Sequence, residues 1–160
     1  MAVDMFIKIG DIKGESKDKT HKESIDLLAW SWGASNSGTT HLGGGGGAGK
    51  ANFQDLSFTK YIDSASPLIV QAVSGGKHYP KVTLTIRKAG DKPIEYLVME
   101  LNEVLVTSYS TGGSGGEDRL TENVTLNFGK FTYSYSPQKN DGTADVAIKA
   151  TYNITENTAA

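Results

Sequence analysis

The chain has 160 residues, enough for one domain, and its 16 basic and 18 acidic residues leave a formal net charge of -2. This balance, without any block of like charge, argues against nucleic acid or an anionic membrane as a partner, and the lack of cysteine excludes disulfides and thiol chemistry. No apolar run approaches the ~20 residues of a membrane helix, and the N-terminus has no signal-peptide pattern, so we expect a single domain over residues 1–160 with no membrane insertion.

Apolar and polar residues alternate over most of the chain, which predicts β-strands. In chain order, the expected strands cover residues 3–9, 25–32, 53–62, 82–87, 94–109, 124–135 and 146–154. The strand over residues 94–109 is too long to stay flat, and we expect it to bend near Asn102. The apolar phase slips by one residue at Gly129 and Lys130, which predicts a β-bulge there.

One segment departs from this alternation. Ser66 followed by Pro67 predicts an N-cap and a proline at the first helical position. Apolar residues then follow at helical spacing as far as Val73, and the pair Gly75-Gly76 ends the segment. Many strands with one short α-helix predict a mainly β fold, an antiparallel β-barrel or sandwich.

Residues 44–51 resemble a P-loop but lack two of its requirements. Ala51 stands where the motif needs a hydroxyl for magnesium, and the segment does not join a buried strand to a helix. We therefore expect a long glycine-rich loop with no nucleotide site.

No set of side chains has the spacing of a catalytic or metal site. The three histidines, His21, His41 and His78, lie far apart in expected loops. The densest charge cluster is 117–119 with Glu122, and it fits acid–base catalysis, a solvated loop or an ion pair between subunits; we favour the last. The sequence predicts no enzyme, no cofactor and no metal.

Several longer motifs resemble one family throughout the chain. They are MAVDMFIKIG (1–10), LAWSWG (28–33), GGGGGAGK (43–50), DLSFTKY (55–61), GKHYP (76–80), LTIRK (84–88) and TGGSGGEDRLTENV (111–124). Taken together, they resemble the Hcp (haemolysin-coregulated protein) family, the tube subunits of the bacterial type VI secretion system.

The resemblance implies a β-barrel with an outer helix, six copies of which form a homo-hexameric ring. Such rings stack into a tube inside a contractile sheath, and contraction expels the tube with its VgrG spike. Small secreted effectors ride in the lumen, where they are bound and protected. The implied route leads from the bacterial cytoplasm to the extracellular space or a target cell without a signal peptide.

Two loops are expected to serve assembly. A run of glycines lets backbones approach closely, so we expect it to contact the next ring in a stack. Its residues are Gly43, Gly44, Gly45, Gly46, Gly47, Gly49 and Lys50. A second loop, over residues 111–122, is expected to make polar contacts at a subunit or ring boundary through Glu117, Asp118 and Arg119.

Strand alternation also assigns the faces of residues 25–32. Trp30 and Trp32 are expected to point into the barrel, because each indole buries ~150–250 Å². Ala29 and Ser31 then face outward, and the family pattern places them on the lumen wall, where Ser31 would touch cargo. Ser31 at a subunit seam is the alternative.

Two other classes of protein remain as alternatives. In a sugar- or peptide-binding β-sandwich, Trp30 and Trp32 would be exposed stacking platforms. In an enzyme, a toxic domain would follow the tube domain, but the sequence given ends at Ala160 directly after the last expected strand.

Overall fold

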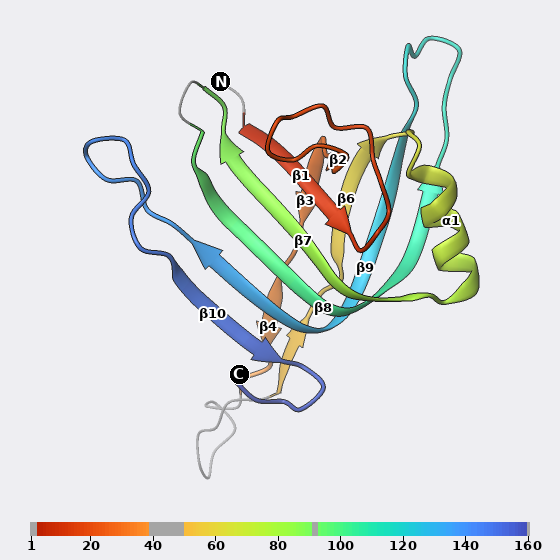
Figure 1. Cartoon of the computed structure of the whole chain (residues 1–160). Helices are drawn as coiled ribbons and strands as arrows, with labels where there is room; N and C mark the ends of the chain where they lie inside the picture. Colours follow the sequence, from red (N-terminus) through yellow and green to blue (C-terminus); the bar gives the residue numbers. More distant parts are fainter. Residues whose placement is uncertain (1–2, 39–49, 91–92, 160) are drawn as a thin grey trace.

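The structure, a computed structural model, describes residues 3–38, 50–90 and 93–159. Its elements form one curled antiparallel sheet, a two-stranded hairpin and a helix, α1 (Ser66–Gly75) (Figure 1). The strands are β1 (Val3–Ile9), β2 (Ile25–Asp26), β3 (Ala29–Ser31), β4 (Ala34–Asn36), β5 (Ala51–Phe53), β6 (Leu56–Tyr61), β7 (His78–Lys88), β8 (Glu95–Thr111), β9 (Thr121–Tyr135) and β10 (Ile148–Asn153). The large sheet has the order β2-β1-β7-β8-β9-β6-β3, with β10 paired to the second half of β9, and β4 pairs with β5.

Residues 25–32 form two short strands, so the prediction of one strand there was wrong. β2 pairs with β1 at one edge of the sheet, and β3 pairs with β6 at the other. Between them the Leu27 N–H donates to the Met5 carbonyl at 2.9 Å, and the Leu28 N–H donates to the Thr59 carbonyl at 2.8 Å. The segment thus crosses from one edge of the sheet to the other, which curls the sheet into a barrel.

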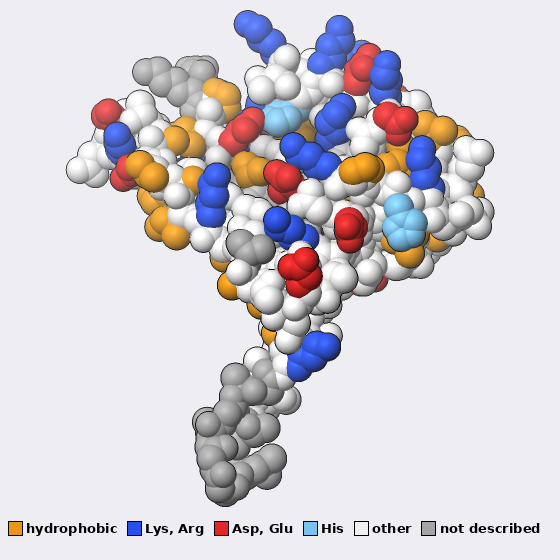
Figure 2. Space-filling view, turned by 60° about the horizontal axis from the view of Figure 1, so that its bottom comes forward, with side chains coloured by type: hydrophobic (Ala, Val, Ile, Leu, Met, Phe, Trp, Pro, Cys, Tyr) orange, Lys and Arg blue, Asp and Glu red, His pale blue; other side chains and the backbone are white. Residues whose placement is uncertain are grey.

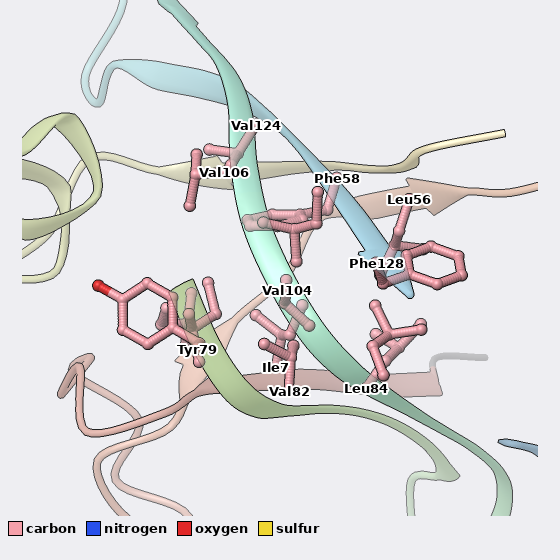
Figure 3. Close-up of a cluster of buried hydrophobic side chains, with 14 of the residues drawn as sticks. Ile7, Leu56, Phe58, Tyr79, Val82, Leu84, Val104, Val106, Val124 and Phe128 are labelled. Atoms are coloured by element: carbon pink, nitrogen blue, oxygen red, sulfur yellow. The ribbon is translucent and has the colours of Figure 1, made fainter. Parts of the chain in front are cut away.

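The core lies on the inner face of the curled sheet, where alternate residues of β1, β6, β7, β8 and β9 meet (Figure 3). Leu84, Val104 and Leu126 are among the fully buried side chains, and each such burial contributes roughly 1.5–3 kcal/mol.

The expected strand over residues 53–62 also divides, into β5 and β6. The N–H of Gln54, which lies between these two strands, donates to the Gly33 carbonyl at 2.9 Å.

In three neighbouring strands, the alternation of inward- and outward-facing side chains slips by one residue at the same level of the sheet. The slips fall at residues 80–81 in β7, 102–103 in β8 and 129–130 in β9, and we call this line across the sheet the bend line. On either side of it the buried residues alternate normally, with Val104 and Leu101 facing inward around the slip in β8. The expected bend near Asn102 is confirmed, and Glu103 there has a φ of 54°. No bulge lies at Gly129, because the β8–β9 register runs through unbroken and shifts instead between Val106 and Ser108.

The helix forms where expected, but its cap differs. Ala65 occupies the N-cap position without a side-chain hydrogen bond, so Ser66 was the wrong cap. Pro67 lies in the first turn, and Gly76 closes the helix in the left-handed conformation with a φ of 64°. Ile69 is buried where α1 packs beside β8. The Ser66 hydroxyl serves a buried polar cluster instead.

Candidate assembly and cargo surfaces

Ala29 and Ser31 lie on the exposed face of the sheet, as the alternation of residues predicts. Both side chains are exposed, whereas Trp30 between them packs against the core. In the β3–β6 register, Ala29 stands opposite Thr59 and Ser31 opposite Ser57. The outward-facing residues of these two strands, exposed in β3 and half-buried in β6, therefore form one continuous surface.

This surface extends onto β9 and is built of small, uncharged side chains. Thr59 Oγ1 donates to Asn123 Oδ1 at 2.6 Å, and Thr125 Oγ1 lies 2.6 Å from the Ser108 hydroxyl. A shallow hollow of about 300 Å³ lies at its centre, lined by Ala29, Trp30, Ser31, Ser57, Phe58, Thr59, Asn123, Val124 and Thr125. We call this surface the neutral wall, because no lining residue carries a charge.

The two tryptophans pack into the barrel, as expected. The Trp32 ring stacks on Phe53 and on Tyr133, with centroids 6.2 and 6.0 Å away, and meets Phe131 edge-on at 5.1 Å. Its Nε1 is buried and has no hydrogen-bond partner among the residues that the structure describes. Since aromatic rings of the chain already cover Trp32, the structure does not favour the tryptophan platform of a sugar-binding protein.

The loop between β8 and β9 presents its charged residues to solvent. Glu117, Asp118 and Arg119 are all exposed, and none has an ion pair within the described part of the chain. The Arg119 guanidinium lies 3.8 Å from the centre of the Tyr61 ring, a cation–π contact that holds the guanidinium against the ring without using its N–H groups as hydrogen-bond donors to an oxygen.

Glu122, which we grouped with this loop, is fully buried and pairs with Lys60. The Lys60 ammonium also donates to Asp63 Oδ1 at 2.8 Å, and the Ser66 hydroxyl donates to Glu122 Oε1 at 2.6 Å. Tyr109 donates to the second carboxylate oxygen. Desolvation and this hydrogen bond raise the pKa of Tyr109 to about 12.

This buried cluster ties β6, β8 and β9 to the start of α1. Sequence reasoning missed it, although a signal was present. Lys60 follows Leu56 and Phe58 at inward positions, and Glu122 precedes Val124 and Leu126 at inward positions. A lysine and a glutamate in phase with core residues indicate a buried pair, because an unpaired buried charge would be costly.

The glycine-rich segment 43–49 lies outside the described residues, as does His41. Lys50, which follows the segment, is exposed. In sequence, the segment and Lys50 lie between β4 and β5, which pair with Ser35 opposite Asn52. His78 was expected in a loop but begins β7. His21 lies in the loop before β2, where its Nε2 is 2.6 Å from Glu95 Oε1 and its ring stacks on Phe6.

Charged side chains are mixed over the face that Figure 2 shows, with neither sign gathered into a large patch. Within residues 3–38, 50–90 and 93–159, no group of three or more His, Asp or Glu side chains is placed to hold a metal ion. The helix in these residues is too short to cross a membrane.

Known proteins with the same fold and related sequences identify the family. Residues 6–135 match the family described as "Type VI secretion system effector, Hcp". Protein hcp1 of Pseudomonas aeruginosa is 66% identical over 162 residues, spanning 100% of both chains.

Solved structures agree. Hcp1 of Salmonella typhimurium has a TM-score of 0.82 at 32% identity and covers 100% of both chains. A type VI secretion system effector of Yersinia pestis has a TM-score of 0.78 at 37% identity, covering 94% of this chain and 99% of its own. The chain belongs to the Hcp family of type VI secretion proteins and is a structural subunit of that system's tube.

Proposed function

We propose that six copies of the chain form a ring, that rings stack into the tube, and that the neutral wall lines the lumen and binds small secreted effectors. The observation that carries the cargo proposal is the composition of this wall around Ala29 and Ser31. Hydroxyl and amide groups hold a partner by hydrogen bonds, each contributing only about 0.5–1.5 kcal/mol. Such a wall binds cargo without retaining it irreversibly.

Within this assembly, the glycine-rich segment with Lys50 makes contact between rings. Glu117, Asp118 and Arg119 make polar contacts at a subunit or ring boundary. The VgrG spike binds the end of the tube and the contractile sheath surrounds it, so the chain leaves the cytoplasm through the machine itself. Nucleic acid and lipid are not partners in this scheme, and neither catalysis nor a cofactor has a part in it.

Ser31→Arg tests the lumen assignment. A long cationic side chain on the neutral wall should block effector binding while rings still form, so co-purifying effectors are lost and a ring-sized species remains. Ser74→Arg, which places the same side chain at an exposed position on α1, is the matched control and should leave effector binding unchanged. If Ser31→Arg breaks the ring, Ser31 lies at a subunit seam and the cargo assignment is wrong.

A further inference from the structure

The bend line opens a hollow of about 630 Å³ on the exposed side of the sheet. This volume falls within the roughly 300–1,000 Å³ of pockets that hold small ligands, so it has room for several side chains. The lining residues are His78, Tyr79, Pro80, Glu103, Asn127, Phe128, Gly129, Ile154 and Thr155. They come from β7, β8 and β9 and from the turn after β10.

Glu103 is the one acidic side chain among these lining residues, and its placement is unusual. Its φ of 54° lies in the left-handed region, which non-glycine residues adopt at a cost of order 1–3 kcal/mol. Its carboxylate lies across Gly129, where an added Cβ would be 3.0 Å from Oε2 and 2.9 Å from Thr155 Oγ1. Glu103 is exposed and has no hydrogen bond or ion pair from its side chain to any residue that the structure describes.

The loop 112–120 lies at the other end of the molecule. It projects beyond the end of β8 and the start of β9, whereas the bend line crosses the same two strands near their middle, where the sheet curves away from this loop (Figure 1). It carries Arg119, whose N–H groups have no carboxylate partner among the described residues, and the acids Glu117 and Asp118. The molecule thus offers a carboxylate in a hollow at the bend line and a guanidinium on a projecting loop, and neither group has an ionic partner among the described residues.

We propose that the bend-line hollow receives the 112–120 loop of a second copy in the next ring, with Glu103 accepting hydrogen bonds from Arg119. This inference rests on the proposed stacking of rings. Contacts between opposite ends of identical subunits are heterologous and repeat without limit, as a tube requires. A guanidinium binds a carboxylate through two parallel hydrogen bonds, which fixes the angle between rings as well as their distance.

The other charges agree with this placement. His78 also lines the hollow, so it offers a hydrogen-bond donor to the loop carboxylates Glu117 and Asp118, and Glu103 is the one carboxylate among the lining residues. Each junction between two rings would contain six copies of the contact. One exposed ion pair is weak, but six pairs between the same two rings strengthen the junction together because all six are held in place by the rings. Loss of the pair should therefore affect stacking far more than the fold of one subunit.

Charge reversal gives the first test, read by electron microscopy and sedimentation of the full chain. Glu103→Arg and Arg119→Glu should each form ring-sized particles but lose the longer stacked particles, and the double variant should regain them. Glu23→Arg, which reverses an exposed glutamate that has a similar left-handed φ of 65° but does not line the hollow, is the control and should stack like the parent. A double variant no better than either single variant would overturn the Glu103–Arg119 pairing.

Cysteine pairs give the second test, on a chain that has no cysteine of its own. In Glu103→Cys/Arg119→Cys, oxidation should link copies end to end and produce a denaturing-gel ladder that extends past six chains. A ladder ending at six would place the contact within a ring and overturn the proposal, as would an equal ladder from Glu23→Cys/Arg119→Cys. Absence of any ring in the parent chain would instead contradict the proposed function.

Discussion

Lys60 and Glu122 show how two charged residues can belong to a hydrophobic core. Both side chains are fully buried, yet Asp63, Ser66 and Tyr109 supply hydrogen bonds that satisfy much of the pair. The desolvation of two ions offsets most of their attraction, so the pair adds little net stability. Its effect is on geometry, because it fixes the start of α1 against β6 and β9.

Removing one partner of this pair should be costly. We expect Lys60→Met to lower the free energy of unfolding by about 3–5 kcal/mol, because Glu122 is left buried without its counter-ion. Lys60→Met/Glu122→Leu should recover part of that loss. Urea unfolding at one fixed protein concentration measures these two variants and Glu122→Leu, and a double variant as unstable as the sum of the two single changes would contradict this account.

A second ionic contact holds the loop before β2 against the sheet. Asp4 and Asp18 both accept hydrogen bonds from Arg87, and the Arg87 guanidinium lies 5.0 Å from the centre of the Phe6 ring. The hydrogen bond from Arg87 is the largest cause that lowers the pKa of Asp18 to about 2. The chain thereby covers the exposed side of β1 and β7 with its own loop.

The depressed pKa of Asp18 sets the sign of a pH effect. The unfolded chain takes up the Asp18 proton near pH 4 and the folded chain only near pH 2, so this contribution is complete above pH 4 and falls as the pH drops from about 4 to 2. Asp18→Asn should reduce the acid sensitivity of the unfolding midpoint in this window. Midpoints that fall equally in both proteins between pH 4 and pH 2 would speak against the contact.

At the scale of elements, an aromatic cluster joins the β4–β5 hairpin to the main sheet. Trp32 precedes β4, Phe53 ends β5, and both meet Phe131 of β9 with ring centroids 5.1 Å apart. Tyr152 of β10 lies 5.2 Å from Phe53. The hairpin that brackets the glycine-rich segment is therefore anchored by rings from three parts of the chain.

Trp32→Ala should loosen this hairpin. Truncation of a packed tryptophan costs about 3–5 kcal/mol, and the value here should lie at the lower end because Trp32 is only half-buried. Trp32→Phe keeps a ring and removes the buried Nε1, which has no partner in the described part of the chain, so it should cost less. In Trp32→Ala, backbone hydrogen exchange should speed up at Asn52 and Phe53 more than at amides of the main sheet. If the amides of β5 and of the main sheet stay equally protected, the cluster does not hold the hairpin.

At the scale of the whole molecule, the single chain leaves apolar surface uncovered. Ile148 is 68% exposed and stands opposite Tyr135, which is 46% exposed, and the nearby Val146 is 81% exposed. β10 pairs with β9 on one side only within the described sheet. An exposed edge strand with apolar side chains favours association, which agrees with assembly as a ring.

We expect native mass spectrometry to give a particle of six times the 17.1-kDa chain at micromolar concentration. Burial of the uncovered apolar surface between neighbours supplies the driving force, so the particle should survive moderate salt better than a contact built on charges alone. A stable monomer or dimer under these conditions would contradict the ring.

The sequence by itself determined what depends on near neighbours in the chain. Alternation located most strands, turned Ala29 and Ser31 outward and Trp30 inward, and spacing located the helix. The motifs, taken together, indicated the family. Each of these follows from the local geometry of a strand or helix, where the direction of a side chain is set by its position in the repeat.

Only the tertiary structure decided which distant segments meet. It divided residues 25–32 between two sheet edges, drew the Ser66 hydroxyl into the Lys60–Glu122 cluster, and moved the register shift from Gly129 to the segment after Val106. It also aligned the phase slips of three strands into one hollow around Glu103. Period-two alternation fixes the face of a residue but not its partner strand, because pairing depends on residues tens of positions away.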